Sequence, residues 1–148
     1  MTWKYIAGFF DGEGSLTFNG KGFRITISQT NKVVLEKIQK FTGKGKIFET
    51  YKRQKHWKDA WVYYIAKQED VYYFLINTQK FLVVKAELVK KIMPSLKKII
   101  DDQKIKSKKR ERTALQVKKL REQGLTYRQI GKKLEVDYGY ARRLVLKK

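Results

Sequence analysis

Two carboxylates, Asp11 and Glu13, follow an apolar run in a chain that has 35 basic residues and only 14 acidic ones. The pattern of residues 6–14 predicts a short helix that ends at Gly12 and Gly14. Both acids therefore lie where a helix passes into a strand. An acid at the C-terminal end of a helix opposes the helix dipole, and it therefore needs a basic partner or a bound divalent cation. Carboxylate-held metal ions can hydrolyse a phosphodiester, because they activate water and neutralise charge on the phosphate.

The composition limits which metal ion and which partner the chain can use. It has no cysteine and a single histidine, which excludes thiolate zinc sites and His-pair sites and leaves oxygen ligands. Oxygen ligands suit Mg²⁺, and Mn²⁺ or Ca²⁺ could occupy the same site. A net charge of +21 over 148 residues favours a polyanionic partner, nucleic acid first and an anionic membrane second. No run approaches the roughly 18 apolar residues of a spanning helix, so we expect no membrane partner.

The residues after the motif alternate in a way that predicts two antiparallel hairpins. Residues 15–19 and 23–29 place apolar and polar side chains on opposite faces, and the Asn-Gly-Lys-Gly sequence at residues 19–22 is a strong hairpin turn. The second hairpin joins residues 46–52 to residues 60–67 through a polar loop. Each hairpin should therefore have one apolar face and one polar face.

Helical patterns separate and follow these hairpins. Thr30 is expected to cap a helix that Gly43 closes, and a further helix begins near Glu69. The next helix covers about residues 80–93, where Pro94 interrupts or restarts the pattern. The order helix, two strands, helix, two strands, helix predicts an α+β fold around one antiparallel four-stranded sheet.

Residues 6–14, Ile-Ala-Gly-Phe-Phe-Asp-Gly-Glu-Gly, resemble the signature of the LAGLIDADG homing endonucleases at every position. The order of elements is also that of one LAGLIDADG core repeat, αββαββα, so the resemblance covers about residues 3–100, and we assign residues 1–100 to the core domain. No second copy of the signature is present, and a single-motif member of this family pairs its motif helix with that of an identical subunit. The resemblance therefore implies a homodimer. Ala7 and Gly8 are small enough to let two helix backbones approach, the alternative being that both pack against the chain's own core.

The same resemblance implies roles for individual residues. Glu13 would ligate the metal ion with help from the carbonyl of Gly12, while Asp11 would be structural, capping or interfacial. Gln29, which ends the second strand on its apolar side, would orient water at the active site. Lys85 would stabilise charge near the scissile phosphate. The alternatives are an ordinary strand-end glutamine and one lysine among many.

The polar faces of the two hairpins are expected to contact double-stranded DNA. A twisted antiparallel sheet fits the major groove, where such side chains reach base edges or phosphates. An ordinary solvated face is the alternative, and the interleaved Lys and Arg favour DNA. The expected DNA-binding residues of the sheet are Ser15, Thr17, Asn19, Lys21, Arg24, Thr26, Ser28, Lys46, Lys52, Arg53, Lys55 and Lys58.

A change of composition after residue 100 predicts a linker. Nine of the 18 residues 104–121 are Lys or Arg. Such a run is typical of a solvated linker or of a helix with an exposed face, and beside nucleic acid it would also bind phosphates. We assign residues 101–113 to a basic linker.

Residues 114–148 predict a small helical appendage. Three helical patterns follow one another, and Thr126 is placed to cap the second. The arrangement resembles a helix-turn-helix, whose last helix, carrying Arg142 and Arg143, would enter the major groove. Glu135 stands where a glycine is common in the turn, and a basic helical tail is the alternative.

The resemblance implies a homodimeric, magnesium-dependent, site-specific DNA endonuclease that cleaves a long pseudo-palindromic site and has no small-molecule substrate. It also implies an intron- or intein-associated mobility role, of which we expect the intron-encoded form. Two alternatives remain: a transcription regulator that joins a degenerate LAGLIDADG core to a helix-turn-helix, and an RNA-binding intron maturase. Regulators of that kind typically lose the metal-binding acids, whereas Glu13, Gln29 and Lys85 are present. The motif begins at the sixth residue, so we expect no signal peptide and a location in a prokaryotic cytoplasm or an organelle.

Overall fold

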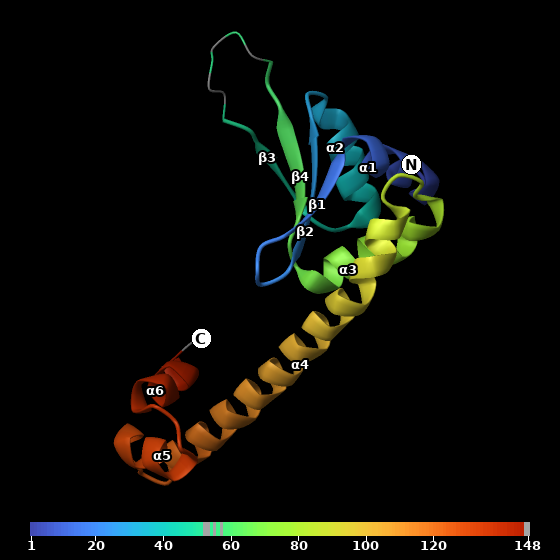
Figure 1. Ribbon diagram of the computed structural model, residues 1–148. Coiled ribbons are helices and arrows are strands. Elements are labelled where there is room, and N and C mark those ends of the chain that lie inside the picture. The colour runs from blue at the N-terminus through green and yellow to red at the C-terminus, as the bar shows by residue number, and fades with distance from the viewer. Residues whose placement is uncertain (52–53, 55, 57, 147–148) are drawn as a thin grey trace. The chain divides into compact units, whose positions relative to one another are not determined.

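The computed structural model describes residues 1–51, 54, 56 and 58–146, and the chain divides into two units, Met1–Ile100 and Asp101–Lys148 (Figure 1). Among the described residues, no helix combines the length and the apolar character that a membrane span requires. The elements, in chain order, are α1 (Trp3–Glu13), β1 (Gly14–Phe18), β2 (Phe23–Gln29), α2 (Lys32–Thr42), β3 (Lys46–Glu49), β4 (Trp61–Ile65), α3 (Gln68–Thr78), the 3-10 turn η1 (Gln79–Phe81), α4 (Ala86–Glu122), α5 (Tyr127–Leu134) and α6 (Tyr138–Leu146).

The first unit is built on one four-stranded antiparallel sheet with the order β1-β2-β4-β3 (Figure 1). In its two central strands Ile25 pairs with Ile65 and Ile27 pairs with Tyr63, and all four side chains are buried. The helices α1, α2 and α3 contact the central strands and share this apolar core. Because side chains alternate along a strand, the other face of the sheet lies outside this core and carries mainly polar residues. The α+β fold with a four-stranded antiparallel sheet is confirmed.

The motif helix α1 passes directly into the sheet. The Thr2 hydroxyl caps its start by accepting the N–H of Tyr5 at 3.2 Å, and Ile6 and Phe10 bury the core-facing side. At the other end, the N–H of Gly14 bonds to the carbonyl of Phe10. A side chain at Gly14 would collide with the Phe10 ring, so this tight passage from helix to strand requires glycine.

Two predicted boundaries in this unit are wrong. Asn31, not Thr30, caps α2, because its Oδ1 accepts the N–H of Val33 at 3.1 Å; the closing glycine, Gly43, is confirmed by its left-handed φ of 63°. The helix predicted over residues 80–93 begins later than expected, because residues 79–81 form a 3-10 turn, residues 82–85 are irregular, and α4 starts at Ala86.

Pro94 lies inside α4 and does not interrupt it. A proline inside a helix costs roughly 3 kcal/mol, since one hydrogen bond is lost and its ring presses on the preceding turn. Val89 and Leu96 on either side of it are fully buried, and Met93 packs against the same core. Tertiary packing therefore holds the helix through the proline.

The predicted linker at residues 101–113 is also helical and belongs to α4. Residues 101–112 are all exposed, as expected of a solvated run. They contain neither Gly nor Pro and are rich in Lys and Arg, which have high helix propensity. In the second unit, Val117 and Leu120 near the end of α4 share a buried core with Ile130 and Ala141.

Candidate functional site

The carboxylate of Asp11, near the end of α1, is bound by main-chain N–H groups from the segment that precedes α4. Oδ2 accepts the N–H groups of Val83 and Val84 at 2.6 and 3.2 Å, and Oδ1 accepts the N–H of Lys85 at 3.0 Å. These amides belong to the segment directly before α4, outside its ladder of main-chain hydrogen bonds. The acid therefore has a backbone partner, and it fastens α1 to the start of α4.

These contacts also set the ionisation of Asp11. Partial burial works to raise the pKa of its carboxyl, but the three N–H donors and the positive charge of Lys85 outweigh it, so the pKa lies below its ordinary value. Asp11 is therefore a firmly ionised structural acid. Because its oxygens already bind these amides, it is poorly placed to act as the principal metal ligand.

Glu13, the last residue of α1, differs from Asp11 in every respect that matters for a ligand. Its side chain is exposed, and no residue that the structure describes forms a hydrogen bond or an ion pair with its carboxylate. Gly12 beside it is also exposed, and its carbonyl is one of the last four in the helix, which have no intrahelical partner. The end of α1 thus presents an uncommitted carboxylate next to a main-chain carbonyl.

Lys85 brings a positive charge to the same place. Its ammonium donates to the main-chain carbonyl of Asp11, one residue before Gly12, and lies 5.5 Å from the centre of the Phe10 ring. The side chain is half-buried. The structure therefore brings together Asp11, Glu13 and Lys85 at one helix end. The contacts to Asp11 come from residues 72 to 74 positions away in the chain.

Gln29 ends β2 at the same end of the sheet. Gly14, which directly follows Glu13, pairs with Ile27, two residues before Gln29. The Gln29 Oε1 accepts the N–H of Thr30 at 2.9 Å and lies 3.3 Å from the Thr30 hydroxyl oxygen. The side-chain amide is half-buried and is held by its own neighbour in the chain.

One copy of the chain does not supply a complete metal site. In the part of the chain that the structure describes, no three His, Asp or Glu side chains come together as a metal-binding group. Glu13 and the Gly12 carbonyl are oxygen donors of the kind that Mg²⁺ prefers, but Mg²⁺ takes six ligands in octahedral geometry. The donors fit such an ion only if a second copy, substrate oxygens and water complete the shell.

The exposed face of α1 differs from the predicted contact between subunits. Ala7 is fully buried in the chain's own core, so its predicted place in a dimer contact is corrected. Gly8 is exposed, and neither Gly8 nor Gly12 has any atom within 4 Å of the position a side chain would take. Tyr5, 49% exposed, lies on the same face, at the i, i+3, i+7 spacing with the two glycines. The open helix face therefore consists of Tyr5, Gly8 and Gly12.

The polar face of the sheet carries six of the residues predicted to bind DNA. By the strand register, the outward positions of the sheet hold Ser15, Thr17, Arg24, Thr26, Ser28 and Lys46. Ser15 and Thr26 bond to each other through their hydroxyls at 2.7 Å. Lys21 and Lys58 are exposed beside the sheet, Arg142 and Arg143 are exposed on α6, and the predicted residues Lys52, Arg53 and Lys55 lie outside the described part of the chain.

Asn19 has a structural task within the predicted DNA-binding set. Its Oδ1 accepts the N–H groups of Lys21 and Gly22 at 3.2 and 3.0 Å and so holds the first hairpin turn. The left-handed Gly20, with φ of 81°, completes this turn. Only the Asn19 amide nitrogen is left to contact a ligand.

The outward face also carries apolar residues that the sequence interpretation did not assign to it. Phe48 is 51% exposed, and its ring contacts Tyr64 edge-on at 6.2 Å between centroids. Val62, opposite Phe48 in the register, lies on the same face. Counting alternate positions along residues 46–49 and 61–65 would have placed all three residues there.

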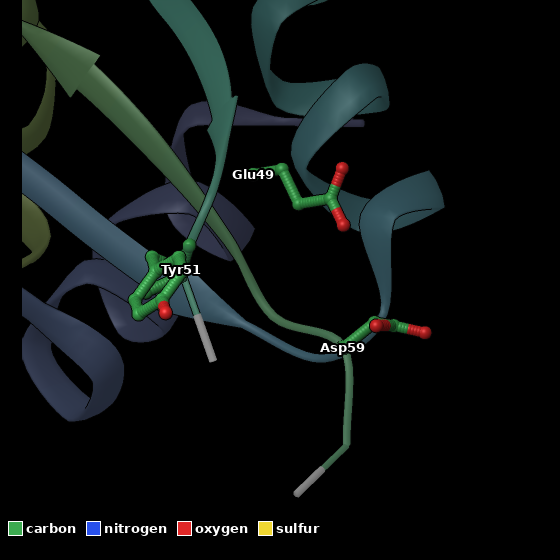
Figure 2. A pocket seen from close by; sticks show the side chains of 4 residues that line it. Glu49, Tyr51 and Asp59 are labelled. Carbon is green, nitrogen blue, oxygen red and sulfur yellow. The ribbon is translucent and has the colours of Figure 1, made fainter. Parts of the chain in front are cut away.

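A pocket lies where β3 leaves the sheet, lined by Glu49, Thr50, Tyr51 and Asp59 (Figure 2). Glu49 and Asp59 come from opposite arms of the second hairpin, and Figure 2 shows the Glu49 carboxylate turned away from Tyr51. None of its lining residues belongs to the predicted active site or to the predicted DNA-binding set.

Comparisons with known proteins agree with this geometry. Residues 3–89 match the model of the LAGLIDADG-like domain family. The fold is similar to that of the archaeal intron-encoded homing endonuclease I-Vdi141I complexed with DNA, with 24% identity and a TM-score of 0.53 over 67% of this chain and 69% of that chain. It is also similar to the homing endonuclease I-CvuI in complex with its target in the presence of Ca, with 18% identity and a TM-score of 0.53 over 68% and 69% of the two chains.

A third similar structure is the meganuclease I-AabMI bound to uncleaved DNA, with 19% identity and a TM-score of 0.52. The match covers 78% of this chain but only 43% of that longer one. No curated protein matches the chain. Since the family model covers more than half of the 148 residues, including the motif helix and all four strands, the chain belongs to the LAGLIDADG-like domain family.

Proposed function

We propose that this chain is a homodimeric, metal-dependent, site-specific DNA endonuclease with an intron-associated homing role. The single observation that carries the proposal is the contrast between the two acids of the motif. Asp11 is bound by three main-chain amides, whereas Glu13 is exposed at the helix end with no described partner. An exposed acid beside an unpaired helix carbonyl does not stabilise the fold. The two groups together do supply oxygen ligands of the kind that a divalent cation requires.

Pairing of two copies through α1 would complete this site. The open face of α1, formed by Tyr5, Gly8 and Gly12, allows close approach of a second backbone. Two α1 helices side by side would bring their Glu13 carboxylates together, and their repulsion would be relieved by a divalent cation. Mg²⁺ is the proposed ion, held by Glu13 and the Gly12 carbonyl, and Mn²⁺ or Ca²⁺ could take its place.

The remaining residues of the site would act on the DNA backbone. When bound, the divalent ion supplies charge neutralisation on the phosphate and an activated water. Lys85 would add positive charge at the end of α1, and Gln29 would orient water through its amide. The outward face of the sheet would lie in the major groove. The similar structures named above were obtained with DNA, which supports DNA as the substrate.

The experiment is a cleavage assay on the genomic DNA that flanks the coding sequence, with Mg²⁺ or with EDTA. The wild-type protein should produce a double-strand cut only with Mg²⁺. Glu13→Gln should bind the same DNA without cutting it, and Glu36→Gln, an equal change on exposed α2, should cut normally. Absence of a wild-type cut, or undiminished cutting by Glu13→Gln, would contradict the proposal.

A second candidate function is a DNA-binding transcription regulator, which the helix-turn-helix geometry of the second unit favours. The same assay separates the two. A regulator would bind the flanking DNA with the same affinity in Mg²⁺ and in EDTA and would leave it intact.

A further inference from the structure

The second unit contains a helical arrangement that phosphodiester cleavage does not require. The end of α4, α5 and α6 share a core in which Val117, Ile130 and Ala141 are fully buried. Thr126 and Gln129 form a reciprocal capping box at the start of α5, with bonds of 3.3 and 2.8 Å. A capping box satisfies two otherwise unpaired amides, so the start of α5 is fixed by the sequence.

The turn between α5 and α6 is short and tightly constrained. It consists of residues 135–137, with Glu135 in the left-handed conformation at φ 52° and the N–H of Val136 bonded to the Gly131 carbonyl at 3.0 Å. Asp137 then starts α6 by accepting the N–H of Tyr140 at 2.8 Å. These hydrogen bonds therefore hold the turn between α5 and α6 in one conformation.

Gly131 shows how closely the two helices approach. A Cβ at this position would lie 2.8 Å from the Val136 carbonyl oxygen and 3.3 Å from the Tyr138 Cα. Two short helices joined by a three-residue turn and touching at a buried small residue form the helix-turn-helix motif. In that motif the second helix is the one that enters the major groove.

The exposed side of α6 carries the side chains suited to this task. Tyr138 is 56% exposed, and Arg142 and Arg143, one turn later, are exposed as well. Tyr138 and Arg142 are one turn apart and lie on the same side of α6, whereas Arg143, in the last turn of the helix, points about 100° away from Arg142. Arginine is the side chain that pairs in bidentate fashion with guanine.

The charge of the second unit fits a polyanion. Residues 101–148 contain sixteen Lys or Arg and six Asp or Glu. On α5, Arg128, Lys132 and Lys133 are exposed, and in this motif the first helix contacts the phosphate backbone.

We propose that the second unit is a separate duplex-DNA-binding site, in which α6 enters the major groove and Arg142 and Arg143 contact guanine edges. This site is independent of cleavage. It would bind duplex DNA whether or not Glu13 is intact.

The test uses the full chain in EDTA, so that no DNA is cut. Binding to a fluorescent duplex is measured by anisotropy between 50 and 200 mM salt, approximately the range over which phosphate-binding proteins lose most affinity. Arg142→Ala/Arg143→Ala should weaken binding about tenfold or more. The charge-matched control, Lys97→Ala/Lys98→Ala, removes two exposed lysines of α4 in the first unit and should change affinity much less.

A charge-preserving variant separates base contact from simple attraction. The DNA sequences that the wild-type protein selects from a randomised duplex library should share a block that contains guanine. The sequences selected by the double variant Arg142→Lys/Arg143→Lys should lack that block, because lysine cannot form the bidentate hydrogen bonds of the arginine guanidinium. The salt dependence of DNA binding should be unchanged, because lysine keeps the positive charge. Hydrogen exchange of the amides in residues 127–146 should slow when DNA is added.

Three results would overturn the proposal. One is an equal loss of affinity in the Arg142/Arg143 and Lys97/Lys98 variants, which would show an effect of bulk charge. Another is unchanged hydrogen exchange over residues 127–146 with DNA bound. The third is displacement of the duplex by an RNA hairpin at lower concentration than by unlabelled DNA. Each can occur while the cleavage assay succeeds, so the two proposals fail independently.

Discussion

Lys85 binds Asp11 twice: its main-chain N–H donates to the Asp11 carboxylate at 3.0 Å, and its ammonium donates to the Asp11 main-chain carbonyl. The two residues are 74 positions apart in the chain. Their contact joins the end of the motif helix to the start of α4. It gives Asp11 a structural role and leaves Glu13 as the uncommitted acid of the pair.

The first prediction concerns this contact. Asp11→Ala should lower the free energy of unfolding by about 1–3 kcal/mol, because three amides lose their acceptor. Urea denaturation of the variant and of the wild type measures the difference. Glu36→Ala, which removes an exposed i,i+4 ion pair with Lys32, should cost less than about 1 kcal/mol and serves as the control. Equal costs for the two variants would contradict the structural role of Asp11.

The second prediction is the pH dependence of the same contact. Three N–H donors and Lys85 hold the pKa of Asp11 below its ordinary value despite the opposing effect of partial burial. The folded state therefore binds the proton less readily than the unfolded state does. The stability that Asp11 contributes should be complete above its ordinary pKa and should be lost as the pH falls through the lowered value. The difference between wild type and Asp11→Asn, measured by urea denaturation from neutral to acid pH, should shrink in that window.

Local patterns predicted the sheet, because alternation and turn chemistry act between neighbours. The Asn19-Gly20 turn and the left-handed Gly43 are both where the pattern placed them. The partners of Asp11 were not predictable in this way. They are main-chain amides of residues 83–85, which have no side-chain pattern and are distant in sequence.

The buried Gln68 escaped sequence interpretation for the same reason. Its side-chain amide bonds the N–H and the carbonyl of Phe23, at 2.8 and 2.9 Å, as a neighbouring strand would. A polar residue at the start of a helix usually indicates exposure, and only the tertiary fold shows its buried partner. The α1 face was misassigned at Ala7 because adjacent residues on a helix point in directions 100° apart, and the neighbouring Gly8 is the exposed one.

The third prediction tests the open face of α1. Gly8→Ala should not destabilise the separate protomer, because nothing lies within 4 Å of the added Cβ and alanine favours a helix over glycine by about 1 kcal/mol. The same substitution should weaken dimerisation, since the added methyl keeps two helix backbones apart. Sedimentation velocity over a range of concentrations measures the shift. Gly14→Ala is the opposite control, because its Cβ would strike Phe10 within the protomer. An unchanged dimer in Gly8→Ala would place the subunit contact elsewhere.

The fourth prediction concerns Glu135, the non-glycine residue that the structure describes with a positive φ. Left-handed conformation costs an L-residue about 1 kcal/mol or more, and glycine avoids that cost. Glu135→Gly should therefore stabilise the α5–α6 unit, seen as slower hydrogen exchange over residues 127–146. Gly131→Ala should have the reverse effect, because its Cβ would lie 2.8 Å from the Val136 oxygen. Faster exchange in Glu135→Gly would show that the glutamate side chain contributes more than the backbone strain costs.

The last prediction concerns removal of residues 104–148. The buried residues of the first unit end at Ile100, so the truncated chain should keep the core and its near-ultraviolet circular dichroism. It should bind duplex DNA more weakly and with a flatter dependence on salt, because the deletion removes every Lys and Arg of the second unit. Anisotropy titrations at several salt concentrations compare the two proteins. An unchanged salt slope would show that the second unit makes no phosphate contacts, and loss of the folded spectrum would show that the core depends on α4 beyond Ile100.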